Sequence, residues 1–528
     1  MFDLIFKNAL IYDGSGAPAF LGTVGVQQGK IVYVGAGAEE LSAHKIIDAD
    51  GLCLAPGFID SHSHSDLSIL EDPSRLHVLR MGVTTEIAGQ CGHSRSPFNK
   101  NMHTSTHETL LPLERPAFES MDDLVHSLDK LKLGTNQLYF TGHGVLRGNV
   151  MDCESRLPNE EEFTRMKELL IQEIKAGSIG ISTGLSYVPG IYSNSDELIS
   201  LAKTAAQYGG IYTTHSRSES MGLFDSVEEC IRIAKEANIA VNISHFKCVG
   251  RVFWERCSKA LKMIDDAISS GLRITIDAYP YTAASTTTLS VIPASFQDKG
   301  VEAFAKSLDD KNVVEAIRYE IYEKNDPSWD NSAYYVGLEN FLVVRANETP
   351  GMIGKTYAEI GKELGVSPFD GMIWMLKKNH ANVYECRFSM CEENVEQILA
   401  HPACAVSSDG IYIPGDKNAH PRAFGTFPRY LGRYIRERKI LSKEEGIRRI
   451  TSMPAERYGL KTKGKIALGY DADFVLFDFN TIYDGGTYLN PFIPNTGIKS
   501  VWINGQMVIE DNEPTGNYIG RYLKRSVI

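Results

Sequence analysis

The chain has 528 residues, with 54 lysines and arginines against 66 aspartates and glutamates, and 43% of its residues are hydrophobic, which is the composition of a globular protein. The formal net charge of −12, without a run of five or more basic residues, argues against nucleic acid or an anionic membrane as the main partner and favours a small molecule. No apolar run approaches the roughly 18 residues of a membrane span, and nine scattered cysteines do not make a disulfide framework, so we expect a protein of the reducing cytoplasm.

Both ends of the chain predict β-strands. Short apolar runs alternate with turns in residues 4–14, 24–35 and 45–57 at one end and 464–479 and 500–516 at the other. The charges of Asp3 and Lys7 make the first run a strand rather than an apolar signal segment, and Asn504-Gly505 predicts a two-residue hairpin turn. Neither end has enough strands to cover both faces of a sheet, so we expect one discontinuous β-sandwich domain from residues 1–56 and 464–528.

The middle of the chain predicts alternating strands and helices. An amphipathic helix fits residues 161–177, and a second begins at Ser195 as its expected N-cap and ends at Gly209. Such repeats are typical of parallel β/α folds, and we expect a closed (β/α)8 barrel over residues 57–463. An open doubly wound sheet is the alternative, but no glycine-rich phosphate-binding motif follows the early strands. Residues 288–341 break the alternation and predict an insertion within the barrel.

Two histidines follow the first apolar run of the predicted barrel. His62 and His64 lie two residues apart after residues 53–59, so on an extended chain both imidazoles face the same side. The carboxyl end of a strand is where barrel enzymes place their sites. We therefore favour a metal-binding pair over two histidines in a polar loop.

Cys91 lies in a glycine-rich turn, between Gly89 and Gly92, after a strand-like run. A free cysteine is most often a small buried hydrophobe. At a strand end it can instead offer a thiolate to a metal ion. The residues alone leave both interpretations open.

Two more histidines and an aspartate also end apolar runs. His215 and His245 are about 30 residues apart, the length of one β/α unit, so we expect them at adjacent strand ends. Asp409 follows the apolar run 403–406, where the eighth strand is expected. An aspartate before a glycine is also a common turn, but the company of the other candidate ligands favours a functional carboxylate.

Together these residues place imidazoles, a thiolate and a carboxylate at one barrel mouth: His62, His64, Cys91, His215, His245 and Asp409. Nitrogen and sulfur donors of this kind suit Zn²⁺. A catalytic zinc ion lowers the pKa of a bound water to about 7, and Asp409 is the group expected to take a proton and return it to a leaving group.

The motifs resemble those of the amidohydrolase superfamily and, more closely, those of the N-acyl-D-amino-acid deacylases. The matching blocks run in the family's order along nearly the whole chain: PGFIDSHSH, GVTTEIAGQCGHS, GISTGLSYVPG, TTHSRSES, ISHFKCVG, DAYPYTAAST, SSDG and HPRAFGTFPRYLGRYIRE. Many superfamily members bridge two metals with a carboxylated lysine that ends strand four, but the corresponding run SIGISTGL has no lysine. The resemblance gives the anionic ligand role to Cys91, at the end of the expected third strand.

The resemblance implies zinc-dependent hydrolysis of N-acyl-D-amino acids to a D-amino acid and a carboxylate. It implies a tightly held zinc on Cys91, His215 and His245, with His62, His64 and Asp409 around a second, weaker or vacant position. Asp409 would accept a proton during the attack and then protonate the departing amine.

The same resemblance assigns five residues to the amino-acid pocket: Tyr187, Lys247, Tyr279, Ser285 and Arg422. Arg422 and Lys247 are the cations expected to draw an anionic substrate into an acidic protein. Four of these assignments have a structural alternative, which is an ion pair for Arg422, a solvated charge for Lys247 and core packing for Tyr187 and Tyr279.

Two other functions are alternatives. Hydrolysis of a cyclic amide, as in dihydroorotases and hydantoinases, is disfavoured by the missing lysine. A non-catalytic scaffold with the same fold is disfavoured because all six polar residues of the expected site are present. No oligomeric state is predicted.

Overall fold

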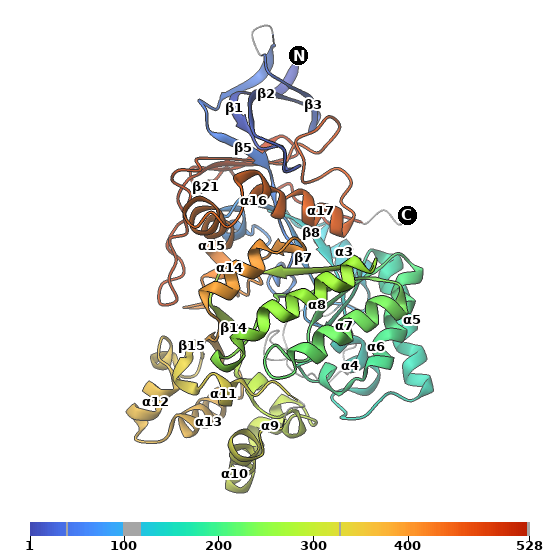
Figure 1. Ribbon diagram of the computed structural model, residues 1–528, viewed down its shortest axis with the longest axis vertical. Helices are drawn as coiled ribbons and strands as arrows, with labels where there is room; N and C mark the ends of the chain where they lie inside the picture. The colour runs from blue at the N-terminus through green and yellow to red at the C-terminus, as the bar shows by residue number, and fades with distance from the viewer. Residues whose placement is uncertain (38–40, 99–117, 327–328, 525–528) are drawn as a thin grey trace.

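The computed structural model describes residues 1–37, 41–98, 118–326 and 329–524. Figure 1 shows three parts along the long axis, with terminal strands at the top, a body of strands and helices in the middle, and a group of short helices at the bottom. Among the helices of these residues, none combines the length and the apolarity that crossing a bilayer requires.

Strands from both ends of the chain share one sheet. They are β1 Phe2–Ile11, β2 Phe20–Gln27, β3 Lys30–Gly35, β4 Ala43–Asp48, β5 Cys53–Pro56, β18 Phe474–Phe477, β19 Ile498–Ile503, β20 Gln506–Glu510 and β21 Glu513–Pro514. Within the described residues they form a nine-stranded sheet in the order β21-β20-β19-β18-β5-β1-β2-β3, with β4 against β1. Antiparallel pairing of β5 with β18 joins the two ends.

This terminal sheet encloses its own apolar core. The ring of Phe6 meets those of Phe474 and Trp502 edge to face, with centroids 5.3 and 5.2 Å apart. Asn504 and Gly505 join β19 to β20 with φ of 46° and 75°, the positive values of the predicted hairpin turn. The division into domains at residues 56 and 464 stays a prediction.

A second set of strands is entirely parallel. It comprises β6 Phe58–Asp60, β7 Val83–Ala88, β8 Asn136–Tyr139, β9 Thr141–Gly142, β10 Gly180–Gly184, β11 Ile211–His215, β12 Ala240–Ile243, β13 Ile274–Ala278 and β17 Cys404–Val406. In the described residues the pairing order is β6-β7-β8 and then β9-β10-β11-β12-β13-β17. Only Phe140 separates β8 from β9, and its N–H donates to Ala88 O at 2.9 Å, so the two act as one strand.

The segments that follow the first and the last of these strands are also bonded to each other. Asp409 N–H donates to His62 O at 2.8 Å, and Ser63 forms a parallel bridge with Gly410. The strand order is therefore that of the predicted (β/α)8 fold.

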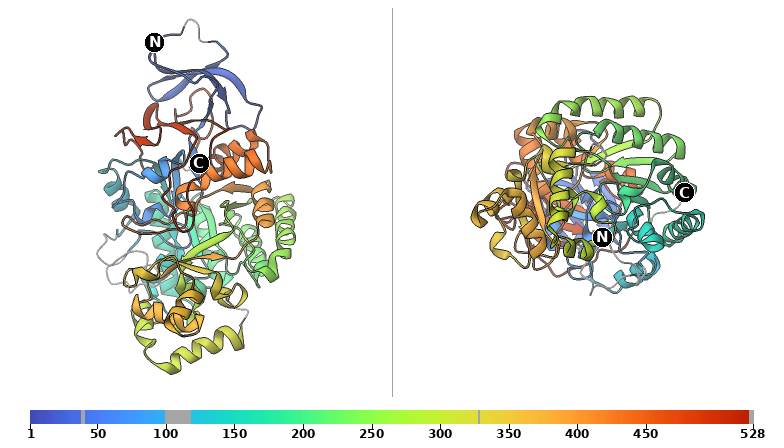
Figure 2. Two further views of the ribbon diagram at one scale, coloured as in Figure 1. Left: turned by 90° about the vertical axis from the view of Figure 1, so that its left-hand side faces the viewer. Right: turned by 90° about the horizontal axis from the view of Figure 1, so that it is seen from below.

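Helices lie around the outside of the molecule when it is seen from below (Figure 2). Those of the barrel part are α1 Leu76–Leu79, α3 Met121–Leu128, α4 His143–Met151, α5 Glu160–Ala176, α6 Ser195–Gln207, α7 Leu223–Ala237, α8 Cys257–Ser269, α14 Glu392–Ala400, α15 Arg422–Arg429, α16 Lys443–Arg449 and α17 Ser452–Tyr458. The predicted end of α5 at Gly177 is confirmed. The N-cap of α6 is Asn194 rather than the predicted Ser195, because the Asn194 side chain accepts the N–H of Glu197.

Between β13 and β17 the chain leaves the barrel. Strands β14 Ala283–Thr287, β15 Phe341–Arg345 and β16 Tyr384–Phe388 form an antiparallel sheet. The segments between these strands contain the helices α9 Val301–Ser307, α10 Lys311–Tyr319, α11 Ser332–Tyr335, α12 Tyr357–Leu364 and α13 Pro368–Lys378, which form the lower part of Figure 1. This unit has a separate apolar core. We call the described residues of 283–388 the insertion, and the predicted range 288–341 lies within it.

Candidate metal centre and active site

The six predicted metal ligands lie at the carboxyl ends of parallel strands. His62 and His64 follow β6, Cys91 follows β7, His215 ends β11, His245 follows β12 and Asp409 follows β17. The prediction that Cys91 ends the third barrel strand is wrong. Cys91 follows the second strand, because residues 136–142 form the third. The others follow the strands for which they were predicted.

Three of these residues have left-handed backbone conformations. The φ angles are 55° at Cys91, 34° at His245 and 47° at Asp409. Positive φ costs free energy in residues other than glycine and concentrates at functional sites. Here it occurs two or three residues after the ends of three different strands.

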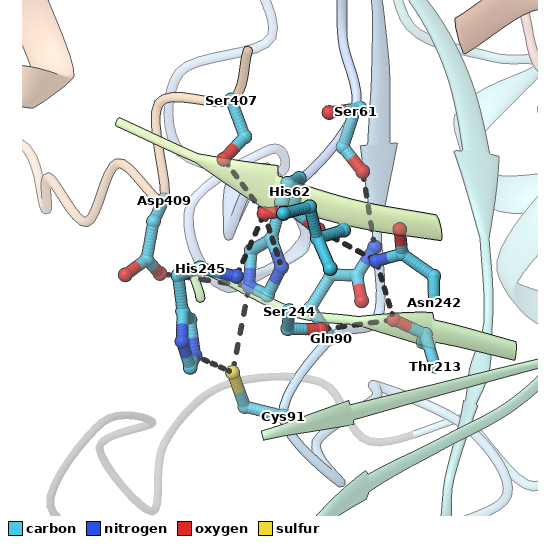
Figure 3. Close-up of polar contacts among 12 residues, drawn as sticks. Ser61, His62, Gln90, Cys91, Thr213, Asn242, Ser244, His245, Ser407 and Asp409 are labelled. Carbon is cyan, nitrogen blue, oxygen red and sulfur yellow. Dashed lines mark hydrogen bonds and ion pairs between the residues drawn. The ribbon is translucent and has the colours of Figure 1, made fainter. Parts of the chain in front are cut away.

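Four ligand side chains converge at one point. Ligand atoms of His62, Cys91, His245 and Asp409 all lie within 4.8 Å of one another, and the four residues are buried. The Cys91 sulfur is 3.4 Å from Nε2 of His62 and 3.4 Å from Nε2 of His245, as the dashed lines in Figure 3 show. Asp409 Oδ1 is 3.5 Å from Nε2 of His62 and 3.2 Å from Nε2 of His64.

His62 and His245 are oriented as metal ligands are. While Nε2 of each ring faces Cys91, Nδ1 of His245 is 2.8 Å from Lys247 Nζ and 3.1 Å from Glu219 Oε1, and Nδ1 of His62 is 3.6 Å from Asp277 Oδ1. A carboxylate behind one ring nitrogen fixes the ring and leaves the other nitrogen for a metal. A carboxylate therefore lies behind each ring, within hydrogen-bond distance of His245 and slightly beyond it for His62.

Asp277 is itself held in place by hydrogen bonds. It accepts from Asn242 Nδ2 at 2.6 Å, from Ser407 Oγ at 2.7 Å and from the backbone N–H of His245 at 2.9 Å. Burial alone would raise the pKa of Asp277, but the His62 and His245 charges and these bonds lower it. The carboxylate is therefore ionised and lies as a negative charge behind the His62 ring.

The charges of the cluster depend on one another. Burial opposes ionisation of the Cys91 thiol, but His62 and His245 outweigh it and hold the pKa of the thiol well below its usual range. Burial likewise would lower the pKa of His64, but hydrogen bonds to Asp409 and Cys91 raise it to about 9. A thiolate held between imidazoles is an environment in which a metal cation can replace protons.

His215 lies beside the central cluster. Its ring centroid is 4.5 Å from that of His245, and its ligand atom falls within 4.8 Å of those of Glu219 and His245. The buried Nδ1 atoms of His62, His64 and His215 have no hydrogen-bond partner among the described residues. Sulfur, nitrogen and carboxylate donors with ring nitrogens still available fit Zn²⁺.

A cavity of about 860 Å³, counted to its open mouth, lies next to the cluster. Barrel loops form one side and the insertion forms the other. All five predicted pocket residues line it: Tyr187, Lys247, Tyr279, Ser285 and Arg422. Tyr187 connects the two sides, since its ring lies 4.7 Å from that of His215 and its hydroxyl is 3.0 Å from Thr286 Oγ1.

The two predicted substrate cations already have acidic partners. Arg422 Nη1 is 2.8 Å from Asp409 Oδ2, and its guanidinium lies 4.6 Å from the centre of the Tyr279 ring. Lys247 Nζ is 2.5 Å from Glu219 Oε1 and is buried rather than solvated. The ion pair considered as an alternative for Arg422 is thus present, and its partner is the candidate catalytic aspartate.

Sequence reasoning missed Glu219 and Asp277. Asp277 lies in the apolar run ITIDA, one residue before the end of β13, which is the kind of position that singled out the other acid. Glu219 lies four residues after His215 without any strand pattern. The loop that carries it is fixed by Asp330 of the insertion, which accepts from Ser218 Oγ at 2.6 Å and from Glu219 N–H at 2.7 Å.

The strand order and the donor cluster define a metal-dependent hydrolase of the barrel type. The chain matches the amidohydrolase family over residues 45–509 and belongs to that family, which confirms the predicted fold class. It is 32% identical to the D-aminoacylase of Alcaligenes xylosoxydans xylosoxydans, over 99% of this chain and 98% of that protein. It is also 32% identical to the N-acyl-D-aspartate deacylase of the same organism, over 97% and 93%.

A solved relative shares the whole fold. The crystal structure of the N-acyl-D-glutamate deacylase from Bordetella bronchiseptica, complexed with zinc and a phosphonate inhibitor, is similar to this chain with a TM-score of 0.85 at 29% identity. The similarity covers 99% of this chain and 100% of that one.

Proposed function

We propose that the protein is a zinc-dependent amidohydrolase that converts N-acyl-D-amino acids into a D-amino acid and a carboxylate. The observation that carries the proposal is the buried contact of the Cys91 sulfur with Nε2 of both His62 and His245, beside Asp409. The deacylase relatives, which match nearly the whole chain, support the substrate class.

The proposed metal ligands are the six predicted residues. Cys91 is equidistant from His62 and His245, so its thiolate can serve a position toward His245 and His215 as well as one toward His62, His64 and Asp409. Zinc, when bound, polarises the acyl carbonyl and lowers the pKa of a water molecule.

Asp409 is the proposed proton carrier. Burial raises the pKa of its carboxyl, but Arg422 and the neighbouring histidines outweigh burial and keep it ionised. An ionised carboxylate can accept a proton during attack on the amide carbon and then deliver it to the nitrogen, which leaves well only when protonated. His64, 3.2 Å from Oδ1, and Arg422, 2.8 Å from Oδ2, hold the carboxylate in one orientation.

Arg422 is the proposed contact for the substrate's α-carboxylate. Its Nε atom is buried and donates no hydrogen bond within the described part of the chain, although Nη1 and Nη2 contact Asp409 and Ser285 O. A guanidinium with an available donor in a cavity suits a carboxylate. Tyr279 and Ser285 line the cavity beside it.

A linear amide is favoured over a cyclic one. Strand β10, the fourth of the barrel, ends at Gly184 without the metal-bridging lysine of many cyclic-amide hydrolases. The near full-length relatives named above are deacylases of linear substrates by name.

The test is an assay of purified, zinc-analysed protein with paired N-acetyl-D and N-acetyl-L amino acids. We expect about one zinc or more per chain and amine release from the D forms. Release only from L forms, or ring opening of a hydantoin without release from linear amides, would contradict the proposal. Metal binding without any hydrolysis would favour the scaffold alternative.

We also propose that the protein works in the cytoplasm. None of the nine cysteines, all of which lie in the described residues, forms a disulfide, and eight of them are buried, which suits a reducing compartment. Fractionation of cells that express the tagged chain tests this, and recovery with the periplasmic or secreted fraction would contradict it.

A further inference from the structure

We propose that the enzyme acts on N-acyl-D-amino acids with a neutral side chain and discriminates against N-acyl-D-aspartate and N-acyl-D-glutamate. The inference rests on the proposed function, since it concerns the same cavity. Sequence identity does not decide the matter, because the D-aminoacylase and the D-aspartate deacylase are equally similar to this chain. The preference follows instead from the pairing of the charged residues that line the cavity.

Every lysine and arginine that lines the cavity within the described residues has one acidic partner. Lys247 pairs with Glu219, Arg422 pairs with Asp409, and Arg387 pairs with Glu385. All six residues are buried. A substrate carboxylate can therefore be accepted only by a cation that still has a donor to offer.

Arg422 is such a cation. Its buried Nε makes no hydrogen bond to a described residue, whereas Nη1 meets Asp409 and Nη2 donates to Ser285 O at 3.1 Å. Every N-acyl-amino acid carries an α-carboxylate, so this position is taken by the group common to all the candidate substrates.

Arg387, on the insertion side, is not available in the same way. Its Nε and Nη2 both donate to Glu385 Oε1, at 2.8 and 2.6 Å, and Nη1 donates to Ser332 Oγ at 2.9 Å. Nη2 also donates to Thr287 O at 3.2 Å. All three nitrogens of this guanidinium are thus committed to the protein.

Glu385 cannot easily release Arg387 to a substrate. Its side chain is fully buried, and its other oxygen accepts hydrogen bonds from Tyr357 at 3.1 Å and from Thr288. Drawing Arg387 away would leave this carboxylate buried without its cation, which is strongly unfavourable. Lys247 is tied in the same way, because Glu219 is buried beside it.

The rest of the insertion-side wall offers no positive charge to a second carboxylate, as far as the described lining residues show. It consists of one small apolar side chain and several hydroxyl groups, namely Ala284, Ser285, Thr286, Thr287, Ser290, Ser332 and Tyr384, and Ser389 follows directly after the insertion. The one further charged residue among the described lining residues there is Asp330, which is an anion. An aspartate or glutamate side chain would meet this wall without a counterion, whereas a neutral side chain would not need one.

The first experiment compares kcat/KM of the zinc-loaded wild-type enzyme for N-acetyl-D-leucine and N-acetyl-D-methionine with N-acetyl-D-aspartate and N-acetyl-D-glutamate. We expect the neutral substrates to be preferred by about 100-fold or more, the discrimination available when a charged group lacks a partner. Equal or better hydrolysis of either acidic substrate would overturn this inference and leave the proposed function intact. Hydrolysis of L forms or cyclic amides alone would overturn both.

The second experiment frees the insertion-side cation with Glu385→Gln. The amide keeps the shape of the carboxylate but not its charge, so Arg387 would carry a net positive charge at the cavity wall. We expect the ratio of acidic to neutral kcat/KM to rise about tenfold, through a lower KM for the acidic substrates.

The matched control is Glu363→Gln, which removes one negative charge from an exposed ion pair with Lys355 on the same insertion. This variant should leave the ratio unchanged. A folded Glu385→Gln enzyme, judged by its melting temperature, with an unchanged ratio would overturn the role of the Arg387–Glu385 pair. The wild-type ratio tests the preference itself even if Glu385→Gln does not fold.

Discussion

The two sides of the active-site cavity differ in how their charged side chains are paired. On the barrel side, Cys91, His62, His245 and Asp409 share charge within one cluster, and the pKa of the Cys91 thiol is held far from its usual range by its neighbours. On the insertion side, Arg387 and Glu385 form a closed pair whose donors are used up. The barrel-side cluster leaves ligand atoms available to a metal ion and a reacting amide. The Arg387–Glu385 pair leaves no free cation, and so it limits which substrate side chains can lie next to the reacting amide.

The largest effect is expected from removing the thiolate at the centre of the barrel side. Cys91→Ala should lose bound zinc and lower kcat/KM by at least about 1,000-fold, because the ligand that faces both histidines is gone. Metal analysis and kinetics on the same preparation measure both. The matched control is Cys230→Ala, which changes another buried cysteine, in helix α7, and should keep metal and turnover. Retained zinc in Cys91→Ala would contradict the role of the thiolate as the central metal ligand of the barrel side.

The next largest effect is expected at Asp409. Asp409→Asn keeps the shape of the side chain but cannot accept the proton, so kcat should fall about 100- to 10,000-fold while the zinc bound through the remaining ligands is retained. Pre-loaded enzyme, assayed by metal content and by kcat, distinguishes the two properties. Loss of zinc in proportion to activity would mean that Asp409 is needed to hold the zinc, and it would contradict a separate role as proton carrier.

A smaller effect is expected behind the metal ligands. Glu219→Gln removes the carboxylate 3.1 Å from His245 Nδ1, so zinc affinity should fall about 10- to 100-fold. Because the side chain at this position is not a reacting group, saturating zinc should restore most of kcat. Glu229→Gln, at an acid that pairs with Arg217 outside the cluster, is the control and should leave zinc affinity unchanged. An unaltered affinity in Glu219→Gln would argue against the carboxylate behind His245.

The smallest effect is expected where the two sides touch. Asp330→Asn weakens the bonds from the insertion to Ser218 and Glu219 without changing a proposed ligand. KM should rise by about tenfold or less with zinc content unchanged, because the substrate wall is less well positioned. Kinetics at fixed zinc content measure this, and a loss of metal would mean that the insertion supports the barrel side directly.

The sequence predicted the barrel side better than the insertion side, for a physical reason. Carboxyl ends of parallel strands must meet at one edge, so His215, His245 and Asp409 could be placed together from the apolar runs before them. Glu219 and Asp330 come from loops, whose positions depend on contacts that no local pattern encodes. The pairing of Glu385 with Arg387 was within reach, since residues two apart on a strand share a face, but the strand β16 was not recognised.

The bond between the two ends of the barrel has a consequence for biosynthesis. Ser408 N–H donates to Asp60 Oδ1 at 2.8 Å, and these residues are 348 positions apart in the sequence. A nascent chain that has emerged only as far as the insertion already contains Cys91, His215 and His245, yet the strand that brings Asp409 to them is still in the ribosome. Metal bound by such an incomplete chain would therefore be unproductive, because the enzyme cannot become competent before β17, the last barrel strand, has been synthesised.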